Sequence, residues 1–266
     1  MPLPPAGERI AYGSGAQQFG ELRVPSGKGP FPVVVLIHGG CWQSEFDYVY
    51  ITRLAAWFAD RGVASWTIEY RRLGDPGGGW PGTFLDVGQA TDFLRTIAKT
   101  HPLDLRRTIA AGHSAGGQLA LWLASRNRLA AGSVLYGKQP LRIGGVLGLA
   151  AITDLARYRI GAPDSCNASV DPLLGGSPAA FPRRYAATSP RQRLPLGVPQ
   201  YFIQGGRDPI VAAASVRSYA RAAARAGDRV RVRALATAGH FETAVPIAQT
   251  EPALADGLRF LLGPAR

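Results

Sequence analysis

The chain has 266 residues, 46% of them hydrophobic and 18% charged, and a formal net charge of +12. This composition excludes a disordered chain, and the length fits one large α/β domain. No apolar run approaches the roughly 20 residues that span a bilayer, and residues 1–10 lack the basic and apolar pattern of a secretion signal. We therefore predict a cytoplasmic protein with no membrane insertion.

The excess of basic residues is nearly all arginine and is spread along the chain, most densely over residues 183–193 and 217–233. A nucleic-acid-binding protein gathers such charges on one face. The alternation with alanine and valine instead favours an ordinary solvated surface, with no nucleic acid as partner. An acidic partner or a membrane surface is the alternative interpretation.

The first motif with chemical content is an aliphatic run that ends abruptly in two glycines. It covers Val33-Val34-Val35-Leu36-Ile37-His38-Gly39-Gly40-Cys41-Trp42. A continuous aliphatic run is typical of a strand buried on both faces in a parallel sheet. Glycines at its exit allow backbone N–H groups to face a ligand, and those of Gly40 and Cys41 are candidate donors to a developing oxyanion. A plain turn at the two glycines is the alternative. His38 is expected to organise the loop rather than act as a base. Trp42 is expected to be either a core residue or part of the pocket wall.

The next segment contains a second candidate binding residue. We predict a helix over residues 47–60, a strand over residues 63–70 and a helix over residues 83–100. Between the last two, residues 74–81 are too rich in glycine and proline for regular structure. This loop follows the carboxyl end of a strand, where open α/β sheets build their sites. Trp80 is therefore a candidate pocket residue, with simple anchoring of the loop as the alternative.

A G-x-S-x-G sequence lies between an apolar run at residues 108–111 and a helical run at residues 118–125. It is Gly112-His113-Ser114-Ala115-Gly116. Between a strand and a helix this pattern is the nucleophile elbow, a turn so tight that its flanking positions must be very small. The turn lifts the Ser114 hydroxyl clear of the backbone and directs the N–H of Ala115 to the same point. Because glycine is frequent in this chain, a chance match is the alternative.

Strands and helices alternate through the first half of the chain, which indicates a parallel sheet with right-handed crossovers. A further strand is predicted over residues 144–150. Residues 153–195 then lose all periodicity, and an irregular stretch of that length inside a compact domain is typical of a lid or binding segment. We predict a small cap over the site, with short helices near Leu155 and Phe181. A merely decorative insertion is the alternative.

The candidate acid and base follow the last strands. The last predicted elements are strands over residues 199–204 and 229–235 and helices over residues 211–226 and 250–262. Asp208 and His240 each follow one of these strands, at the same edge of the sheet as Ser114. The order Ser…Asp…His is that of the α/β-hydrolase triad, which predicts Ser114 as nucleophile, His240 as base and Asp208 as the partner of the base. Asp154, also after a strand, is the rival for the acid.

These motifs together resemble the α/β-hydrolase superfamily, and within it the esterases with an HGG-type oxyanion loop. The chain is most similar to the bacterial carboxylesterase and kynurenine-formamidase-like group, from residue 31 to the C-terminus. The family's triad and oxyanion-hole positions fall on Ser114, Asp208, His240, Gly40, Cys41 and Ala115. Hormone-sensitive-lipase relatives carry a third glycine where this chain has Cys41, so that subgroup fits less well. The resemblance implies the α/β-hydrolase fold, a mostly parallel twisted sheet flanked by helices.

The two cysteines add little to this interpretation. Cys41 and Cys166 form no C-x-x-C motif and no cluster with histidine, so no metal site is predicted. A bridge between them would be unusual in a reducing compartment. The predicted chemistry needs neither a metal nor an organic cofactor.

Three functions remain open from the sequence. The first is a serine carboxylesterase that cleaves small or aryl esters through an acyl-enzyme, with Trp42 and Trp80 as candidate substrate-binding residues. The second is an amide hydrolase of the arylformamidase type, acting on a substrate like N-formylkynurenine with the same triad. The third is a non-catalytic binding protein on a hydrolase fold, against which the intact triad argues.

Overall fold

The computed structural model describes residues 3–263, and within that range the strands form one eight-stranded sheet. The strands are β1 (Glu8–Ala11), β2 (Phe19–Arg23), β3 (Phe31–Ile37), β4 (Ala64–Ile68), β5 (Leu103–His113), β6 (Val146–Leu149), β7 (Gln200–Gly205) and β8 (Val230–Leu235). Their order across the sheet is β1-β2-β4-β3-β5-β6-β7-β8. From β4 to β8 neighbouring strands are parallel, whereas β1 and β2 are antiparallel to their neighbours. The predicted parallel sheet is confirmed.

The antiparallel strands β1 and β2 were not predicted. No residue of β1 is fully buried, and neither strand contains an aliphatic run like that of β3, so the hydrophobic pattern gives no signal. β2 is held against β4, with Gly20 close to the buried ring of Trp66. A Cβ atom on Gly20 would lie 2.6 Å from that ring. Glycine at this position therefore lets the indole pack directly on the backbone of β2.

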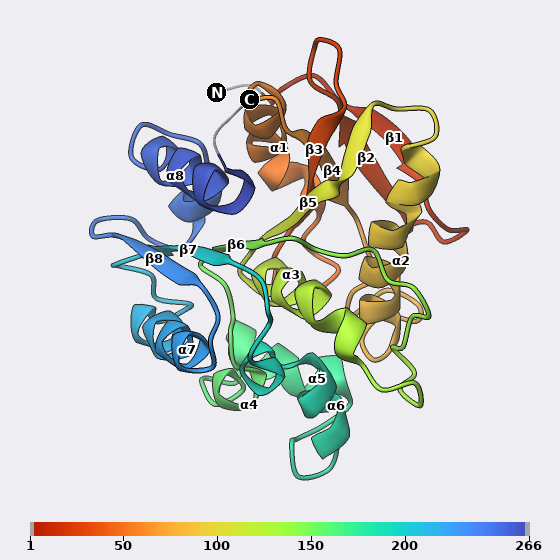
Figure 1. The fold of residues 1–266 in the computed structure, drawn as a ribbon. Helices are drawn as coiled ribbons and strands as arrows, with labels where there is room; N and C mark the ends of the chain where they lie inside the picture. Colours follow the sequence, from red (N-terminus) through yellow and green to blue (C-terminus); the bar gives the residue numbers. More distant parts are fainter. Residues whose placement is uncertain (1–2, 264–266) are drawn as a thin grey trace.

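Helices cover both faces of the sheet (Figure 1). They are α1 (Thr52–Ala59), α2 (Gly82–Ile97), α3 (Ala115–Ser125), α4 (Leu155–Tyr158), α5 (Val170–Leu174), α6 (Pro182–Thr188), α7 (Ala213–Arg225) and α8 (Glu251–Leu262). α1 and α8 pack on one face, and α2, α3 and α7 pack on the other. All of the long helices predicted from the sequence are present, with ends shifted by a few residues.

β3 shows why the sheet is buried on both sides. Its side chains alternate between the two core clusters: Val33 and Val35 face α2 and α3, whereas Val34 and Leu36 face α1. All four are inaccessible to solvent. A strand with two apolar faces needs a helix layer on each, and the described helices that form both layers all follow β3 in the chain. The carboxyl end of β3 is thereby fixed in the middle of the sheet.

The segment over residues 153–195 connects β6 to β7 and carries α4, α5 and α6. Figure 1 shows these three short helices together on the side of the sheet that α3 and α7 cover. Leu155, Leu173 and Tyr185 from this segment are buried in the core cluster of that face. The short helices predicted near Leu155 and Phe181 are present as α4 and α6, whereas α5 was not predicted.

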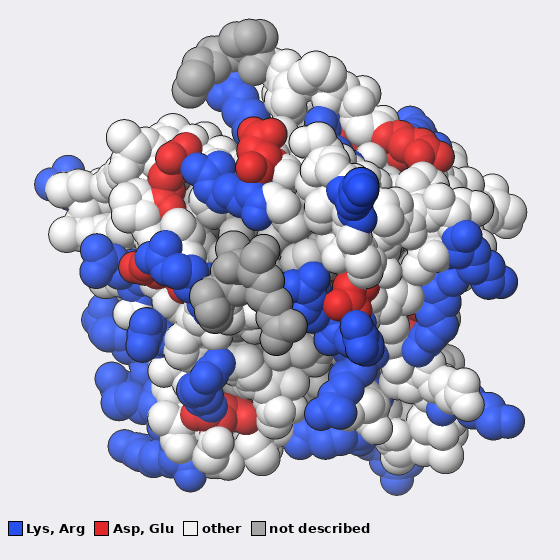
Figure 2. All heavy atoms as spheres, turned by 45° about the horizontal axis from the view of Figure 1, so that its top comes forward, with Lys and Arg blue, Asp and Glu red and all other residues white. Residues whose placement is uncertain are grey.

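The surface carries its basic residues in a scattered arrangement. On the face shown in Figure 2, lysine and arginine side chains are distributed widely, with acidic side chains between several of them. Among the described residues, no helix is long and apolar enough to cross a membrane.

Candidate active site

Ser114 lies between β5 and α3 in a conformation that non-glycine residues rarely adopt. Its φ and ψ are 56° and −118°, a strained backbone region that clusters at functional sites. The flanking glycines leave room for this turn: a Cβ atom on Gly112 would lie 2.1 Å from the carbonyl oxygen of Gly116. One on Gly116 would lie 2.2 Å from the carbonyl oxygen of Ile37. The strand–turn–helix context that the elbow requires is therefore present.

Asp208 and His240 lie in direct contact. The Nδ1 atom of His240 is 2.8 Å from Oδ2 of Asp208, and both side chains are almost fully buried. The other oxygen, Oδ1, accepts hydrogen bonds from the backbone N–H groups of Ile210 and Val211, each at 2.8 Å. Burial raises the pKa of Asp208, but the hydrogen bonds from His240 and from these N–H groups outweigh it and hold the pKa below its usual value. The carboxylate is therefore ionised and fixes the ring of His240.

Ser114 and His240 are at the same edge of the sheet but are not hydrogen-bonded in this structure. The ring of His113, the residue next to Ser114, lies 4.6 Å from the ring of His240, measured between centroids. Both Ser114 and His240 are buried. Among the described residues, the Ser114 hydroxyl has no hydrogen-bond partner. Catalytic hydrogen bonds in a site without substrate are commonly long and tighten in the substrate complex.

Asp154, the rival for the acid, has a different role. It is the N-cap of α4, and its Oδ1 atom accepts the backbone N–H of Arg157 at 3.2 Å. Aspartate is among the preferred N-cap residues because its oxygen satisfies an orphan donor at the helix start. The contact with His240 is made by Asp208 and not by Asp154.

The loop after β3 has a backbone suited to presenting N–H groups. Gly40, Cys41 and Trp42 have φ values of 101°, 54° and 56°, three successive residues in the left-handed region. Within the described residues, the N–H groups of Gly40, Cys41 and Ala115 donate no hydrogen bond to the protein. Free donors at these positions fit the oxyanion hole predicted from the sequence.

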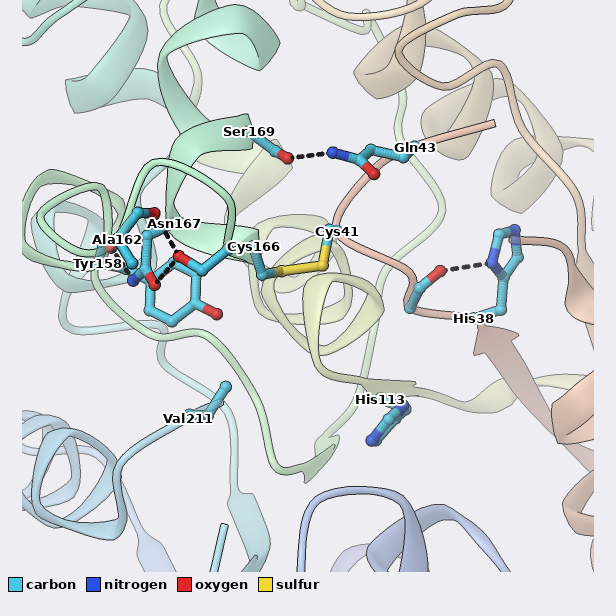
Figure 3. The surroundings of a disulfide bond; sticks show 12 residues. His38, Cys41, Gln43, His113, Tyr158, Ala162, Cys166, Asn167, Ser169 and Val211 are labelled. Atoms are coloured by element: carbon cyan, nitrogen blue, oxygen red, sulfur yellow. Dashed lines mark hydrogen bonds between the residues drawn. A yellow bond between two sulfur atoms is a disulfide. The ribbon is translucent and has the colours of Figure 1, made fainter. Parts of the chain in front are cut away.

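Cys41 and Cys166 form a disulfide bond, a pairing that the sequence left open and that would be unusual in a reducing compartment. Their Cα atoms are 5.1 Å apart, and 125 residues separate them in the chain. Figure 3 shows the bond running from the loop after β3 to the turn before α5. The bridge thus ties the proposed oxyanion loop to the segment over residues 153–195. Such a bond persists in oxidising compartments, which weighs against the cytoplasmic prediction.

His38 organises the loop, as predicted. Its Nε2 atom is 2.8 Å from Oε1 of Glu69, and its Nδ1 atom is 2.7 Å from the carbonyl oxygen of Gly39. The ring stacks on Tyr70 with a centroid distance of 4.5 Å. Both ring nitrogens of this fully buried side chain are therefore occupied, so His38 is not free to act as a base.

A family model identifies the protein family of this chain. The model of the BD-FAE family matches residues 22–221. The chain belongs to the BD-FAE family. A comparison with curated proteins finds no match.

Solved structures share the fold of this BD-FAE family member. A truncated carbohydrate esterase from gut microbiota is 18% identical, with a TM-score of 0.80, and the alignment covers 96% of this chain and 95% of that one. Esterase 2 of Thermogutta terrifontis bound to propionate is 21% identical, with a TM-score of 0.78, and 98% and 97% of the chains are covered. The same esterase phosphonylated by sarin is 20% identical, with a TM-score of 0.79, over 100% and 99% of the chains. The predicted α/β-hydrolase fold is confirmed.

Trp42 and Trp80 differ in their surroundings. Trp42 is fully buried in the core, and its indole N–H donates to Oε1 of Gln118 at 3.2 Å. This burial favours the core alternative for Trp42. Trp80 is half-buried and packs on Phe84 at 6.0 Å between ring centroids, and the guanidinium of Arg184 lies 5.2 Å from the Trp80 ring. Trp80 thus connects the glycine-rich loop to α6 of the segment over residues 153–195.

A hydrogen-bonded relay that the sequence analysis missed links the proposed oxyanion loop to the base. The N–H of Gly39 donates to the hydroxyl of Tyr50 at 2.6 Å, and that hydroxyl is 2.8 Å from Nδ1 of His113. On the other side of the ring, Nε2 of His113 is 3.2 Å from the carbonyl oxygen of His240. No sequence signal indicates this relay, because its members come from four separate segments.

The proton positions in this relay are fixed by its two ends. A backbone N–H can only donate and a carbonyl oxygen can only accept. The Tyr50 hydroxyl therefore accepts from Gly39, and Nε2 of His113 carries a proton that it donates to the carbonyl oxygen of His240. In a neutral ring, Nδ1 carries no proton and accepts from the Tyr50 hydroxyl. Burial, together with repulsion from His240, lowers the pKa of His113 to about 3.

We expect Tyr50→Phe to lower kcat with little change in KM. The substitution leaves the N–H of Gly39 without its acceptor, and such a loss costs about 1–3 kcal/mol. If half of that loss falls on the transition state, kcat decreases about tenfold or less, since about 1.4 kcal/mol corresponds to a factor of ten. Tyr48→Phe in the same turn is the matched control, and steady-state kinetics on a small ester is the measurement. Equal kcat values for the two variants would contradict the role of the relay.

The buried neutral state of His113 makes folding stability depend on pH. Unfolded histidine has a pKa of about 6.5, whereas that of His113 is about 3 in the folded protein. Below pH 6.5 the unfolded state therefore binds a proton that the folded state does not, and stability falls as the pH falls. The contribution of this group is about 1.4 kcal/mol per pH unit. Chemical unfolding between pH 6.5 and 4 measures it.

The quantity that reports on His113 is the change in unfolding free energy per pH unit, not the unfolding free energy at any one pH. In His113→Gln this contribution to the slope should disappear, whatever the substitution does to stability at neutral pH. His101→Gln is the control, because His101 lies near the surface and bonds to Glu8. An unchanged slope in His113→Gln would show that His113 is not held neutral.

Proposed function

We propose that this protein is a serine hydrolase of carboxylic esters, with Ser114 as nucleophile, His240 as general base and Asp208 as the residue that orients the base. The observation that carries the proposal is the pairing of a strained elbow at Ser114 with the buried Asp208–His240 contact at the same edge of the sheet. Family membership and the shared fold of proteins described as esterases support it. The substrate is accordingly a small molecule.

In the proposed reaction, the Ser114 hydroxyl attacks the carbonyl carbon while Nε2 of His240 takes its proton. Asp208 accepts the hydrogen bond from Nδ1, which holds the ring in the required tautomer and stabilises its positive charge. His240 then gives the proton to the leaving alcohol as the ester bond breaks. Water, deprotonated by His240, attacks the acyl-enzyme, and the acid is released as Ser114 regains its proton.

The N–H groups of Gly40, Cys41 and Ala115 are the proposed donors to the oxyanion of the tetrahedral intermediate. Removing one such donor from an enzyme typically costs about 3 kcal/mol of transition-state stabilisation. The three groups donate no hydrogen bond within the described residues, so no protein contact must break before they bind the oxyanion. The disulfide at Cys41 and the His38 contacts hold the loop in place.

The segment over residues 153–195 is the proposed cap of a single α/β-hydrolase domain, and small or aryl esters are the proposed substrates. The burial of Ser114 and His240 supports an enclosed site, and Trp80 is the proposed contact between the cap and the loop after β4. An enclosed site excludes long acyl chains, whereas an open groove would gain about 0.8 kcal/mol for each methylene that it buries.

A comparison of substrates tests this proposal. We expect p-nitrophenyl acetate and butyrate to be hydrolysed efficiently and long-chain, emulsified triglycerides to be poor substrates. N-formylkynurenine provides the comparison with the arylformamidase alternative, which the same triad would serve. Faster turnover of the formamide than of every ester would contradict the ester assignment. Efficient turnover of long-chain triglycerides would contradict the enclosed site and leave the triad proposal intact.

A further inference from the structure

A cavity of about 570 Å³ lies between α4 and the start of α7. Figure 1 shows these two helices as neighbours on the same side of the sheet. The lining contains Ile152 and Ile210 from the loops that follow β6 and β7, together with Arg157, Tyr158 and Arg191 from the segment over residues 153–195. We call this cavity the α4–α7 pocket. The mechanism proposed above uses none of these side chains.

The α4–α7 pocket adjoins the proposed catalytic residues. The backbone N–H of Ile152 bonds to the carbonyl oxygen of Ser114 at 3.2 Å. The backbone N–H of Ile210 bonds to Oδ1 of Asp208 at 2.8 Å. Two lining residues are thus hydrogen-bonded directly to the nucleophile and to the acid. The pocket is therefore one residue shell from Ser114 and Asp208, whose own side chains do not line it.

Tyr158 supplies an unused hydrogen-bond donor in the pocket. Its hydroxyl oxygen is buried and has no partner among the described residues. A buried polar group without a partner costs about 1–3 kcal/mol, so an unmatched hydroxyl beside a cavity marks a position where a ligand atom belongs. Figure 3 shows the ring next to Cys166, with the hydroxyl pointing away from α4. Burial raises the pKa of Tyr158, so the hydroxyl keeps its proton and can donate.

The position of Tyr158 is fixed by its neighbours. The carbonyl oxygen of Tyr158 accepts a hydrogen bond from Nδ2 of Asn167. Asn167 follows Cys166, which the disulfide ties to the proposed oxyanion loop. These contacts hold Tyr158 near the proposed oxyanion loop, and its hydroxyl makes no hydrogen bond with the described residues.

Two arginines in the lining add side chains that can only donate hydrogen bonds. The guanidinium of Arg157 forms no ion pair or hydrogen bond with the described residues. Arg191 uses one nitrogen, Nη1, to bond the carbonyl oxygen of Ser218 at 3.3 Å. The only carboxylate among the described lining residues, Asp154, caps α4. Two arginines and one aspartate leave the lining with one excess positive charge.

We propose that the α4–α7 pocket binds a carboxylate on the substrate, so that the preferred esters carry a second, ionised carboxyl group. A carboxylate is a pure acceptor of hydrogen bonds and suits the paired donors of arginine. One negative charge balances the excess charge of the lining, and one carboxylate oxygen supplies the missing partner of the Tyr158 hydroxyl. The proposal rests on the proposed ester hydrolysis and names the substrate class for that site.

Two pairs of esters of matched shape test the proposal. Monoethyl succinate and ethyl isocaproate differ in having a carboxylate or an isopropyl group at the end of the acyl chain. Acetoxypropionate and isoamyl acetate differ in the same way on the alcohol side. We expect kcat/KM to be at least about tenfold higher for the carboxylate member of one pair, a factor that corresponds to about 1.4 kcal/mol. The pair that shows the preference identifies which side of the ester bond lies in the pocket.

Variants then assign the preference to the pocket. Tyr158→Phe and the double variant Arg157→Gln/Arg191→Gln should lower kcat/KM for the carboxylate ester and leave the neutral ester unchanged. The matched control is Arg217→Gln/Arg221→Gln, which removes two exposed charges of α7 that do not line the pocket. Equal kcat/KM within both pairs, or an equal loss in the control, would overturn the proposal.

A binding measurement separates this proposal from the proposed function. Calorimetry with the Ser114→Ala protein should show binding of monoethyl succinate or of acetoxypropionate that Arg157→Gln/Arg191→Gln weakens. If no ester is hydrolysed by the unsubstituted protein but this binding persists, the pocket assignment stands and the ester hydrolysis is wrong. If esters are hydrolysed but the binding is absent, the pocket assignment is wrong.

Discussion

Ser114→Ala should reduce ester hydrolysis by a factor of about 10⁵–10⁶, the loss seen when the nucleophile of a serine triad is removed. The hydroxyl is the only protein group in the proposed mechanism that forms a covalent bond to the substrate, and no other side chain can replace it in the elbow. Alanine is small enough for the turn, so the melting temperature should change little. The measurement is the rate with p-nitrophenyl acetate after subtraction of the uncatalysed rate.

The control for this substitution is Ser14→Ala, in an exposed turn near the N-terminus. It should retain full activity. Substantial hydrolysis by Ser114→Ala would show that the bond to the acyl group is made elsewhere. A large drop in the melting temperature of Ser114→Ala would mean that the lost activity reports on folding, and the active-site assignment would then need the labelling experiment described below.

Breaking the Cys41–Cys166 disulfide should lower the stability of the protein strongly. The bond closes a loop of 125 residues, and the chain-entropy model gives about 4–5 kcal/mol for loops of this order. At about 2–4 °C per kcal/mol for a chain of this size, Cys166→Ser should melt about 10–20 °C below the unsubstituted protein. The proposed oxyanion loop also loses its tie to α5, so kcat should fall as well.

A reducing agent tests whether the loss of stability comes from the broken disulfide or from the substituted side chain. Dithiothreitol should lower the melting temperature of the unsubstituted protein toward that of Cys166→Ser and should leave the variant unchanged. Cys41→Ser should match Cys166→Ser in stability, because each variant removes the same bond. Two free thiols titrated in the native, unreduced protein would contradict the pairing.

The parts of the fold that the sequence predicted are those with local signals. The aliphatic run of β3 has two buried faces, and that alone indicates a parallel sheet with helices on both sides. The glycines around Ser114 mark the elbow because no other residue fits between the backbone of α3 and β3. Asp208 and Asp154 both follow strands and both lie between Ser114 and His240 in the chain. The position of Asp154 before the predicted cap favoured Asp208, which is the one that contacts His240.

What the sequence could not predict depends on contacts between distant segments. Cys41 and Cys166 are 125 residues apart, and no spacing rule brings them together. The relay from Gly39 through Tyr50 and His113 likewise requires the folded sheet. Trp42 could be core or pocket wall because an indole serves either purpose, and its burial against Gln118, which favours the core, depends on the folded structure.

The assignment of Ser114 as nucleophile is tested most directly by covalent labelling. A fluorophosphonate reacts with an activated serine as the oxygen bonds to phosphorus and fluoride leaves. Peptide mass spectrometry should find one adduct, on Ser114, formed at a rate that falls when His240 is replaced by glutamine. Labelling of another residue, or of Ser114 at the same rate in His240→Gln, would contradict the proposed triad.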